Sequence, residues 1–200
     1  MIDTDRSALR AALRERRRAL PPTARFAAAE AMAERLRPRL GRIGYLAGYW
    51  AMDGELPLHA VLRGTPPFVY CLPVLQAGRS LRFAAWRPGD PLQPNRYGIP
   101  EPPLAPSSLL EPTALDVVLL PLLGFDRHGN RLGTGGGYYD RSFAFLRGRR
   151  RPARPRLIGV GYACQEVAAL PAAEWDVGLD AIVTECEWID CVPGPCPGNG

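Results

Sequence analysis

Residues 117–141 constrain the fold of this chain more than any other stretch. An apolar run from Val117 to Leu123 has the length of a buried strand, and it is followed by a polar turn, a run of glycines and a helical pattern. Glycine adopts backbone conformations that other residues resist, so a glycine-rich turn allows several amides to face one anion. A strand, a glycine-rich turn and a helix in this order therefore predict an anion-binding site at the end of a strand.

The glycine-rich turn is not one of the common nucleotide motifs. No Gly-Lys-Ser/Thr follows it, so it is not a P-loop, and no carboxylate lies near Leu157, where a dinucleotide fingerprint would need one. Arginines on both sides could add charge-assisted contacts to a phosphate. They are Arg127, Arg131 and Arg141. Without a ligand, the same pattern would be a tight crossover from a strand to a helix.

The rest of the chain predicts one α/β domain over residues 1–190, with a flexible tail at 191–200. Helices are expected at 5–20, 23–36, 57–62 and 164–170, and strands at 43–50, 68–72, 81–85, 117–123, 157–161, 181–185 and 188–189. The apolar stripes of the first two helices are expected to comprise Leu9, Leu13 and Leu20, then Phe26, Met32 and Leu36. Alternating helices and strands predict a Rossmann-like open sheet with helices on its faces, where ligands lie beyond the carboxyl ends of the strands.

Composition narrows the classes of ligand and location. All 25 basic residues are arginine and the net charge is +5, so an acidic ligand would be held by guanidinium groups. Arginine clusters at 14–18 and 147–156 are expected to be solvated faces, not a nucleic-acid site. The five cysteines have no zinc spacing, residues 1–20 lack an apolar segment, and the apolar run at Val117 is too short to span a membrane. These features predict a cytoplasmic protein with free thiols. A monomer is also expected, although none of these features determines the oligomeric state.

A resemblance to a known family rests on the central stretch. Residues 124–133 (GFDRHGNRLG), closed by GGGYYD at 135–140, resemble the signature of 5-formyltetrahydrofolate cyclo-ligases, also called methenyltetrahydrofolate synthetases. Weaker similarity extends over roughly residues 5–185. The resemblance implies a CoA-transferase-like variant of the fold. It also implies an ATP- and Mg²⁺-dependent closure of 5-formyltetrahydrofolate, including polyglutamylated forms, to the 5,10-methenyl compound. ATP would phosphorylate the formyl oxygen, and the neighbouring folate nitrogen would then displace phosphate.

The resemblance also implies nucleotide-binding residues. ATP contacts are expected at Arg6, Arg10, Arg131, Gly133, Gly135, Gly136, Gly137 and Tyr139, with Arg131 and Tyr138 as catalytic residues. Arg6 stands where the family usually has lysine, which replaces a point charge by a planar fork. Gly136 stands where some members have lysine, so that cationic contact must come from Arg131 or Arg10.

Folate and metal residues follow from the same resemblance. Folate contacts are expected at Trp50, Glu55, Tyr97 and Tyr138, and Mg²⁺ ligands at Asp140 and Asp176. A carboxylate at residue 55 would accept hydrogen bonds from adjacent N–H groups of the pterin, and the Tyr97 ring would stack on the folate. Mg²⁺ needs few protein ligands, because phosphates and water complete its shell. The chain departs from the family pattern at Pro57 and Leu58, which replace polar residues, and at Trp175, which replaces the usual His or Asn.

Other interpretations stay open from sequence alone. Without the resemblance, Arg6 would be a solvated helix residue, Glu55 a turn cap, Trp50 a core aromatic and Asp176 a loop carboxylate. The glycine loop would also suit another nucleotide-binding enzyme, such as a small-molecule kinase or a methyltransferase. The arginine clusters would suit a nucleic-acid-binding module with a steep salt dependence.

Overall fold

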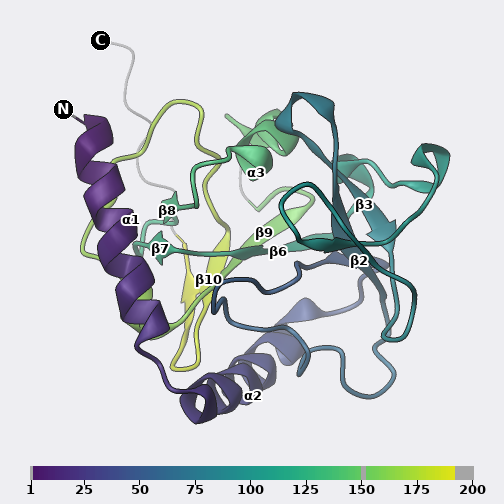
Figure 1. The fold of residues 1–200 in the computed structure, drawn as a ribbon, viewed down its shortest axis with the longest axis horizontal. Coiled ribbons are helices and arrows are strands. Elements are labelled where there is room, and N and C mark those ends of the chain that lie inside the picture. Colours follow the sequence, from purple (N-terminus) through teal and green to yellow (C-terminus); the bar gives the residue numbers. More distant parts are fainter. Residues whose placement is uncertain (1, 150–151, 192–200) are drawn as a thin grey trace.

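The protein is built around one seven-stranded sheet with helices on its faces (Figure 1), as seen in a computed structural model that describes residues 2–149 and 152–191. The strand order is β11-β10-β9-β6-β1-β2-β3. The strands are β1 (Tyr45–Ala47), β2 (Val69–Leu75), β3 (Leu81–Ala85), β6 (Val117–Pro121), β9 (Arg156–Val160), β10 (Ala181–Val183) and β11 (Trp188–Asp190). The five central strands are parallel, and β3 and β11 are antiparallel edges. The predicted open α/β sheet is confirmed.

The sheet has a topological switch point between β1 and β6. From β1 the chain proceeds outward to β2 and β3, and later it returns to β6 and proceeds to β9 and β10 on the opposite side. The two strands pair in parallel, with Leu46 opposite Val117 and Ala47 opposite Val118. Loops leaving the carboxyl ends of β1 and β6 therefore diverge, and open α/β sheets bind their ligands in the crevice that such loops leave.

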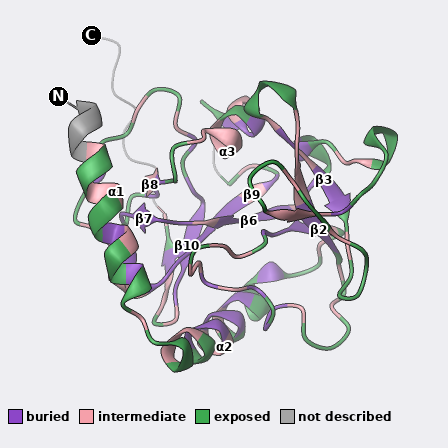
Figure 2. Cartoon of the chain, viewed as in Figure 1, coloured by how far each residue is buried: buried purple, intermediate pink, exposed green. Residues whose placement is uncertain are grey.

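Two apolar layers cover the sheet (Figure 2). Helix α2 (Pro22–Leu40) packs on one face through small residues and Met32, Leu36 and Leu40. Helix α3 (Tyr138–Ser142) and the 3₁₀ turn Ala144–Leu146 cover the other face with Phe143 and Leu146. Helix α1 (Ile2–Arg18) lies against a small hairpin beyond the end of β6, where Leu13 contacts Leu123, Leu132 and Leu170.

This hairpin, β7 (Gly124–Phe125) and β8 (Arg131–Leu132), begins the central motif. Asp126 is fully buried at its turn, where Oδ1 accepts the amides of His128 at 3.0 Å and Asn130 at 3.1 Å. Its Oδ2 accepts the amide of Leu170 at 2.9 Å. The predicted polar turn is confirmed, and its carboxylate acts as a structural cap that fixes the hairpin ahead of the glycines.

Several expected helices are shorter or absent. Residues 57–62 contain no helix, with turns at 59–62, and the helix expected at 164–170 is only the 3₁₀ turn Ala163–Gln165. Helices therefore do not alternate regularly with strands after β1. The proline-rich segment 87–112 holds a two-stranded ribbon, β4 (Gln93–Pro94) and β5 (Pro100–Glu101). Further 3₁₀ turns are Ala77–Arg79, Pro106–Ser108 and Pro112–Ala114.

The expected apolar stripe of α2 is partly wrong. Phe26 is 57% exposed and stacks on His59, with ring centroids 5.8 Å apart. The buried face of α2 instead follows Ala29, Ala33 and Leu36. Small alanines let the helix approach the sheet closely, so the large Phe26 ring is not needed in the core. The four described cysteines are free thiols, whereas Cys196 and the tail from residue 192 lie outside the described residues. Among the described residues, no helix has the length and apolarity needed to cross a membrane.

Candidate active site

One cavity of about 730 Å³ lies at the switch point and contains every site residue predicted from the sequence. Its lining includes residues of α1 and of the proline-rich loop. The predicted residues that line it are Arg6, Arg10, Trp50, Glu55, Tyr97, Arg131, Gly133, Gly135, Gly136, Gly137, Tyr138, Tyr139, Asp140 and Asp176. Residues not predicted to belong to the site also line it, among them Arg14, Arg17, Tyr49, Met52, Arg147 and Trp175.

The glycine loop uses left-handed backbone at two positions. Gly135 has a φ of +105° and Gly137, just before α3, has a φ of +67°. At Gly133, by contrast, an added Cβ would meet no described protein atom within 4 Å. Nε of Arg10 donates to the carbonyl of Gly133 at 3.0 Å, which ties the loop to α1. The loop therefore presents open backbone to the cavity with an arginine beside it.

Positive charge at this loop comes from side chains and not from a helix end. The helix expected after the loop has only five residues, Tyr138–Ser142, which is too short for a substantial macrodipole. Arg141 Nη1 donates to the carbonyl of Gly136 at 3.0 Å. Arg127, which the sequence placed among the flanking arginines, pairs instead with Glu166 and Glu187 and does not line the cavity.

Both aspartates predicted as metal ligands are paired with arginine. Arg6 Nη2 lies 3.3 Å from Asp176 Oδ2, and Arg131 pairs with Asp140 Oδ1. The same oxygen of Asp140 accepts the Val177 amide at 3.1 Å, so both contacts use Oδ1. In the described residues, no group of three or more His, Cys, Asp or Glu side chains could hold a metal ion. The donor set fits Mg²⁺ only where phosphate and water oxygens complete the shell.

Trp175 stands at the rim beside this arginine-rich side. The preceding turn is fixed because Asp176 donates its amide to the Ala173 carbonyl at 2.9 Å and accepts the Ala173 amide on Oδ2 at 3.0 Å. The side chain of Trp175 is nevertheless exposed, with 63% of the residue accessible, and it lines the cavity. A rigid turn thus presents a large aromatic surface next to the Arg6–Asp176 pair.

Two tyrosines close the opposite side of the cavity. Tyr97, from the proline-rich loop, meets Tyr138 edge to face with centroids 6.3 Å apart and hydroxyls 3.0 Å apart. Arg96 Nη2 donates to the Tyr138 hydroxyl at 2.8 Å, and Arg96 Cζ lies 5.1 Å from the centroid of the Tyr97 ring. Hydrogen bonds from Tyr97 and Arg96 lower the pKa of Tyr138. The proline-rich loop and the glycine loop therefore meet through one aromatic pair.

Trp50 and Glu55 follow β1 and line the cavity floor. Trp50 is 37% exposed and packs edge to face on Trp86 with centroids 6.0 Å apart. Glu55 Oε2 accepts the Met52 amide at 3.0 Å. Burial raises the pKa of Glu55, and the Met52 amide and the charge of Arg17 oppose that rise. Burial also raises the pKa of Tyr139, so its hydroxyl stays protonated.

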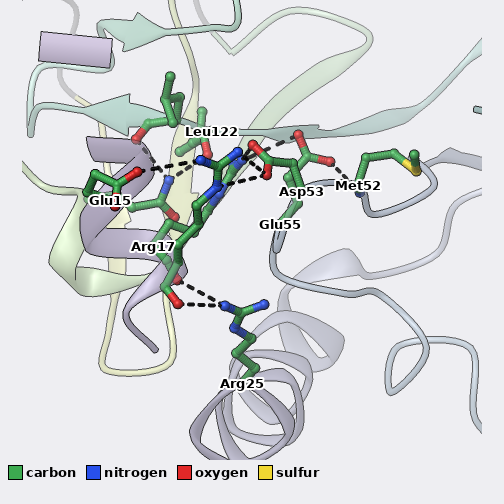
Figure 3. Close-up of polar contacts among 10 residues, drawn as sticks. Glu15, Arg17, Arg25, Met52, Asp53, Glu55 and Leu122 are labelled. Atoms are coloured by element: carbon green, nitrogen blue, oxygen red, sulfur yellow. Dashed lines mark hydrogen bonds and ion pairs between the residues drawn. The ribbon is translucent and has the colours of Figure 1, made fainter. Parts of the chain in front are cut away.

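The expected position of Arg17 is wrong. It was placed on a solvated face of α1, yet its side chain is only 1% exposed. Its Nη2 lies 3.0 Å from Asp53 Oδ2 and its Nη1 lies 4.0 Å from Glu55 Oε1 (Figure 3). The spacing could have shown this, because residue 17 follows the buried Leu13 by four positions and continues the same helical stripe.

Comparisons with known proteins agree on one family. The model of the 5-formyltetrahydrofolate cyclo-ligase family matches residues 2–185. The 5-formyltetrahydrofolate cyclo-ligase of Escherichia coli K12 is 37% identical over 179 residues, which cover 86% of this chain and 96% of the relative. The solved structure of 5,10-methenyltetrahydrofolate synthetase from Aquifex aeolicus has a TM-score of 0.77 at 26% identity, covering 97% of this chain and 96% of its own. The Mycoplasma pneumoniae synthetase shares the fold, with a TM-score of 0.69 at 24% identity over 90% of this chain and 99% of its own.

Proposed function

The chain belongs to the 5-formyltetrahydrofolate cyclo-ligase family, and we propose that its cavity binds Mg-ATP and 5-formyltetrahydrofolate side by side and uses the ATP to close the folate ring. The observation that carries the proposal is the division of one cavity between two kinds of lining. Arg6, Arg10 and the glycine loop that Arg10 ties to α1 form one kind of lining, and Trp50, Glu55 and Tyr97, from the loops after β1 and β4, form the other. Such a cavity suits an anion beside a flat heterocycle.

ATP would lie on the glycine-rich side. Arg6, Arg10 and Arg131 would contact the phosphates together with the backbone of residues 133–137, and Tyr139 would form a wall. Two observations support the fit. Nε of Arg6 is buried and has no hydrogen-bond partner among the described residues, and the space beside Gly133 is open. The exposed Trp175 indole offers a stacking surface for the base.

Mg²⁺ would be held between the phosphates and the carboxylates of Asp140 and Asp176. The bound ion would neutralise charge that develops on the phosphates during transfer. Each aspartate is already paired with a cavity arginine, so the carboxylates also position Arg131 and Arg6. Removing either aspartate should therefore affect the nucleotide as well as the metal.

The folate would lie on the aromatic side. Glu55 would accept hydrogen bonds from the pterin, Tyr97 and Trp50 would cover its faces, and Tyr138 would contact the substrate near the reacting group. The polarised Tyr138 hydroxyl and the Arg131 guanidinium would donate to oxygens on which negative charge develops. These side chains supply positioning and electrostatic stabilisation, which are the main protein contributions to phosphoryl transfer.

The proposed reaction has two steps, a phosphorylation and a ring closure. The formyl oxygen attacks the γ-phosphorus of ATP and ADP leaves, which gives a formyl phosphate ester with an activated carbon. The second folate nitrogen then attacks that carbon and loses its proton, the C–O bond breaks, and inorganic phosphate leaves with the former formyl oxygen and takes up a proton. The sum is 5-formyltetrahydrofolate plus ATP to 5,10-methenyltetrahydrofolate, ADP and phosphate.

A direct assay tests the proposal. Purified protein with Mg-ATP and 5-formyltetrahydrofolate should produce the near-ultraviolet absorbance of the methenyl product, and omission of ATP or Mg²⁺ should abolish it. A folded protein that yields no methenyl product with all components present would contradict the proposal. The cytoplasmic location, the monomeric state and the use of polyglutamylated folate stay predictions; analytical ultracentrifugation and a comparison of mono- and polyglutamylated substrates test the last two.

A further inference from the structure

Arg17 is the most deeply buried arginine of the described residues, and it lies at the wall of the cavity. We propose that Arg17 is a positioning residue that holds Glu55 as a carboxylate, oriented toward the pterin. This inference rests on the proposed folate contact of Glu55. Helix α1 would then contribute to both substrate sites, with Arg6 and Arg10 at the ATP site and Arg17 at the folate site.

The hydrogen bonding of Arg17 is incomplete for a purely structural ion pair. Its Nη2 contacts Asp53, but its buried Nε and Nη1 have no hydrogen-bond partner in the described part of the chain. Asp53 is 42% exposed and already receives two hydrogen bonds from Arg18, at 3.2 and 3.0 Å. A surface carboxylate with a solvated arginine beside it does not require a second, fully buried arginine. The unsatisfied Nη1 instead lies 4.0 Å from Glu55 Oε1.

The surroundings hold this geometry in place (Figure 3). Arg25 donates to the carbonyls of Arg18 at 3.0 Å and Leu20 at 2.9 Å, which fixes the carboxyl end of α1. The same guanidinium lies against the turn after β1, where a Cβ added to Gly54 would be 2.9 Å from Arg25 Nη1. Gly54 has a φ of +77°, a conformation that favours glycine. The end of α1 and the turn that carries Glu55 thus lie against each other and are joined by the pairs of Arg17 and Arg18 with Asp53.

Arg17 is the cation that opposes the other influences on Glu55. The groups that face Glu55 are Arg17, Asp53, Tyr49 and Tyr139. Burial and the charge of Asp53 raise the pKa of Glu55, whereas the Met52 amide and Arg17 lower it. Neither tyrosine carries positive charge in any protonation state. Loss of Arg17 therefore raises the pKa of Glu55 further, and a larger fraction of Glu55 is protonated at neutral pH.

The sign of the effect gives a specific pH test. If the pterin contact needs the carboxylate, kcat/KM for 5-formyltetrahydrofolate is high above the pKa of Glu55 and falls below it. Arg17→Met should shift this acid limb upward by roughly one pH unit or more, since an opposite charge at this distance lowers a carboxylate pKa by about 1–3 units. At neutral pH the KM for folate should rise while the KM for ATP stays unchanged. Arg17→Lys keeps the positive charge, so its acid limb should lie close to that of the wild type.

Two further variants separate charge from structure. Arg18→Met is the matched control, because Arg18 also pairs with Asp53 but is 54% exposed; it should leave the acid limb unchanged. Asp53→Asn should shift the acid limb of the pH profile in the opposite direction, to lower pH. It removes a negative charge near Glu55, and Glu55 becomes the remaining carboxylate partner of Arg17. Asp53 has a φ of +48°, a conformation that asparagine adopts readily, so this variant should fold even if Arg17→Met does not.

Titration of Glu55 by carbon NMR, assigned with Glu55→Gln, gives a readout independent of turnover. Its pKa should rise in Arg17→Met, fall in Asp53→Asn and stay constant in Arg18→Met. Coincident pKa values in wild type, Arg17→Met and Asp53→Asn would overturn the inference, as would an upward shift in Asp53→Asn. A wild-type protein that fails to bind 5-formyltetrahydrofolate would instead refute the proposed function, whatever the titration shows.

Discussion

Replacing Gly133 with alanine puts one methyl group into the cavity while leaving the described protein undisturbed. An added Cβ at this position meets no described atom within 4 Å, and φ lies outside the left-handed region. The free energy of unfolding should therefore not fall, and the loss of backbone freedom in the unfolded chain should raise it by about 0.4–1 kcal/mol. Any loss of ATP affinity must then come from the space that the methyl group takes from the ligand.

The size of that loss follows from the proposed contact. A phosphate oxygen within hydrogen-bonding distance of the loop backbone leaves no room for a methyl group. The bound phosphate or the loop must shift, and we expect ATP affinity to fall at least about tenfold, or 1.4 kcal/mol. The Arg10–Gly133 hydrogen bond uses only the carbonyl of residue 133, so the substitution leaves that tie intact.

Gly135→Ala and Gly148→Ala complete the comparison. At Gly135 φ is +105° and the nearest described atom to a Cβ is Arg10 Cζ at 4.0 Å, so alanine brings strain of roughly 1–3 kcal/mol without a clash. It should lose both stability and ATP affinity. Gly148 has a φ of +68°, open surroundings and a place outside the cavity, so its alanine variant should lose stability only.

Calorimetric titration with Mg-ATP gives the ATP affinity, and thermal unfolding gives the stability, of the wild type and the three alanine variants. A folded Gly133→Ala protein that binds ATP as tightly as the wild type would refute the reasoning, because the loop backbone would then not meet the phosphates. A Gly133→Ala protein with a lower unfolding free energy would show that the loop is packed more tightly than the structure indicates.

Three further predictions concern the cavity walls. Glu55→Gln should weaken folate binding by roughly 1–3 kcal/mol, which raises the folate KM about 5- to 150-fold, with little effect on the ATP KM; equal effects on both would exclude a direct pterin contact. Asp140→Asn should raise the Mg²⁺ concentration needed for turnover while far-ultraviolet circular dichroism stays unchanged, and full activity at low Mg²⁺ would refute the metal assignment. Trp175→Ala should weaken ATP but not inorganic tripolyphosphate in calorimetry, and equal weakening of both would exclude stacking on the base.

The sequence predicted the strands and the loop well because their signals are local. The apolar runs at 81–85 and 117–123 predict strands, and the structure has β3 (Leu81–Ala85) and β6 (Val117–Pro121) there. The glycine loop was recognised because left-handed backbone at Gly135 and Gly137 leaves few alternatives to glycine. That the loops after β1 and β6 share one cavity follows from the strand order, which was not predicted.

The failures arise where tertiary contacts override a local pattern. Phe26 was expected in the core by size, but the closely packed alanine face of α2 left it outside. Residues 57–62 have helical composition, yet buried Leu58, Ala60 and Val61 pack as turns between β1 and β2. Arg17 was assigned to solvent by its charge, although its position in the stripe of Leu13 placed it inside. A charge at a position that continues an apolar stripe is therefore the sequence signal that indicates a buried charged side chain.

The central claim is that the site activates the formyl oxygen by phosphoryl transfer, and the fate of that oxygen tests it most directly. 5-Formyltetrahydrofolate labelled with ¹⁸O in the formyl group is turned over with unlabelled Mg-ATP, and the released phosphate is examined by phosphorus NMR or mass spectrometry. The account predicts one ¹⁸O in each phosphate and one ADP for each methenyl product. Label that appears in water while the phosphate stays unlabelled would contradict the account.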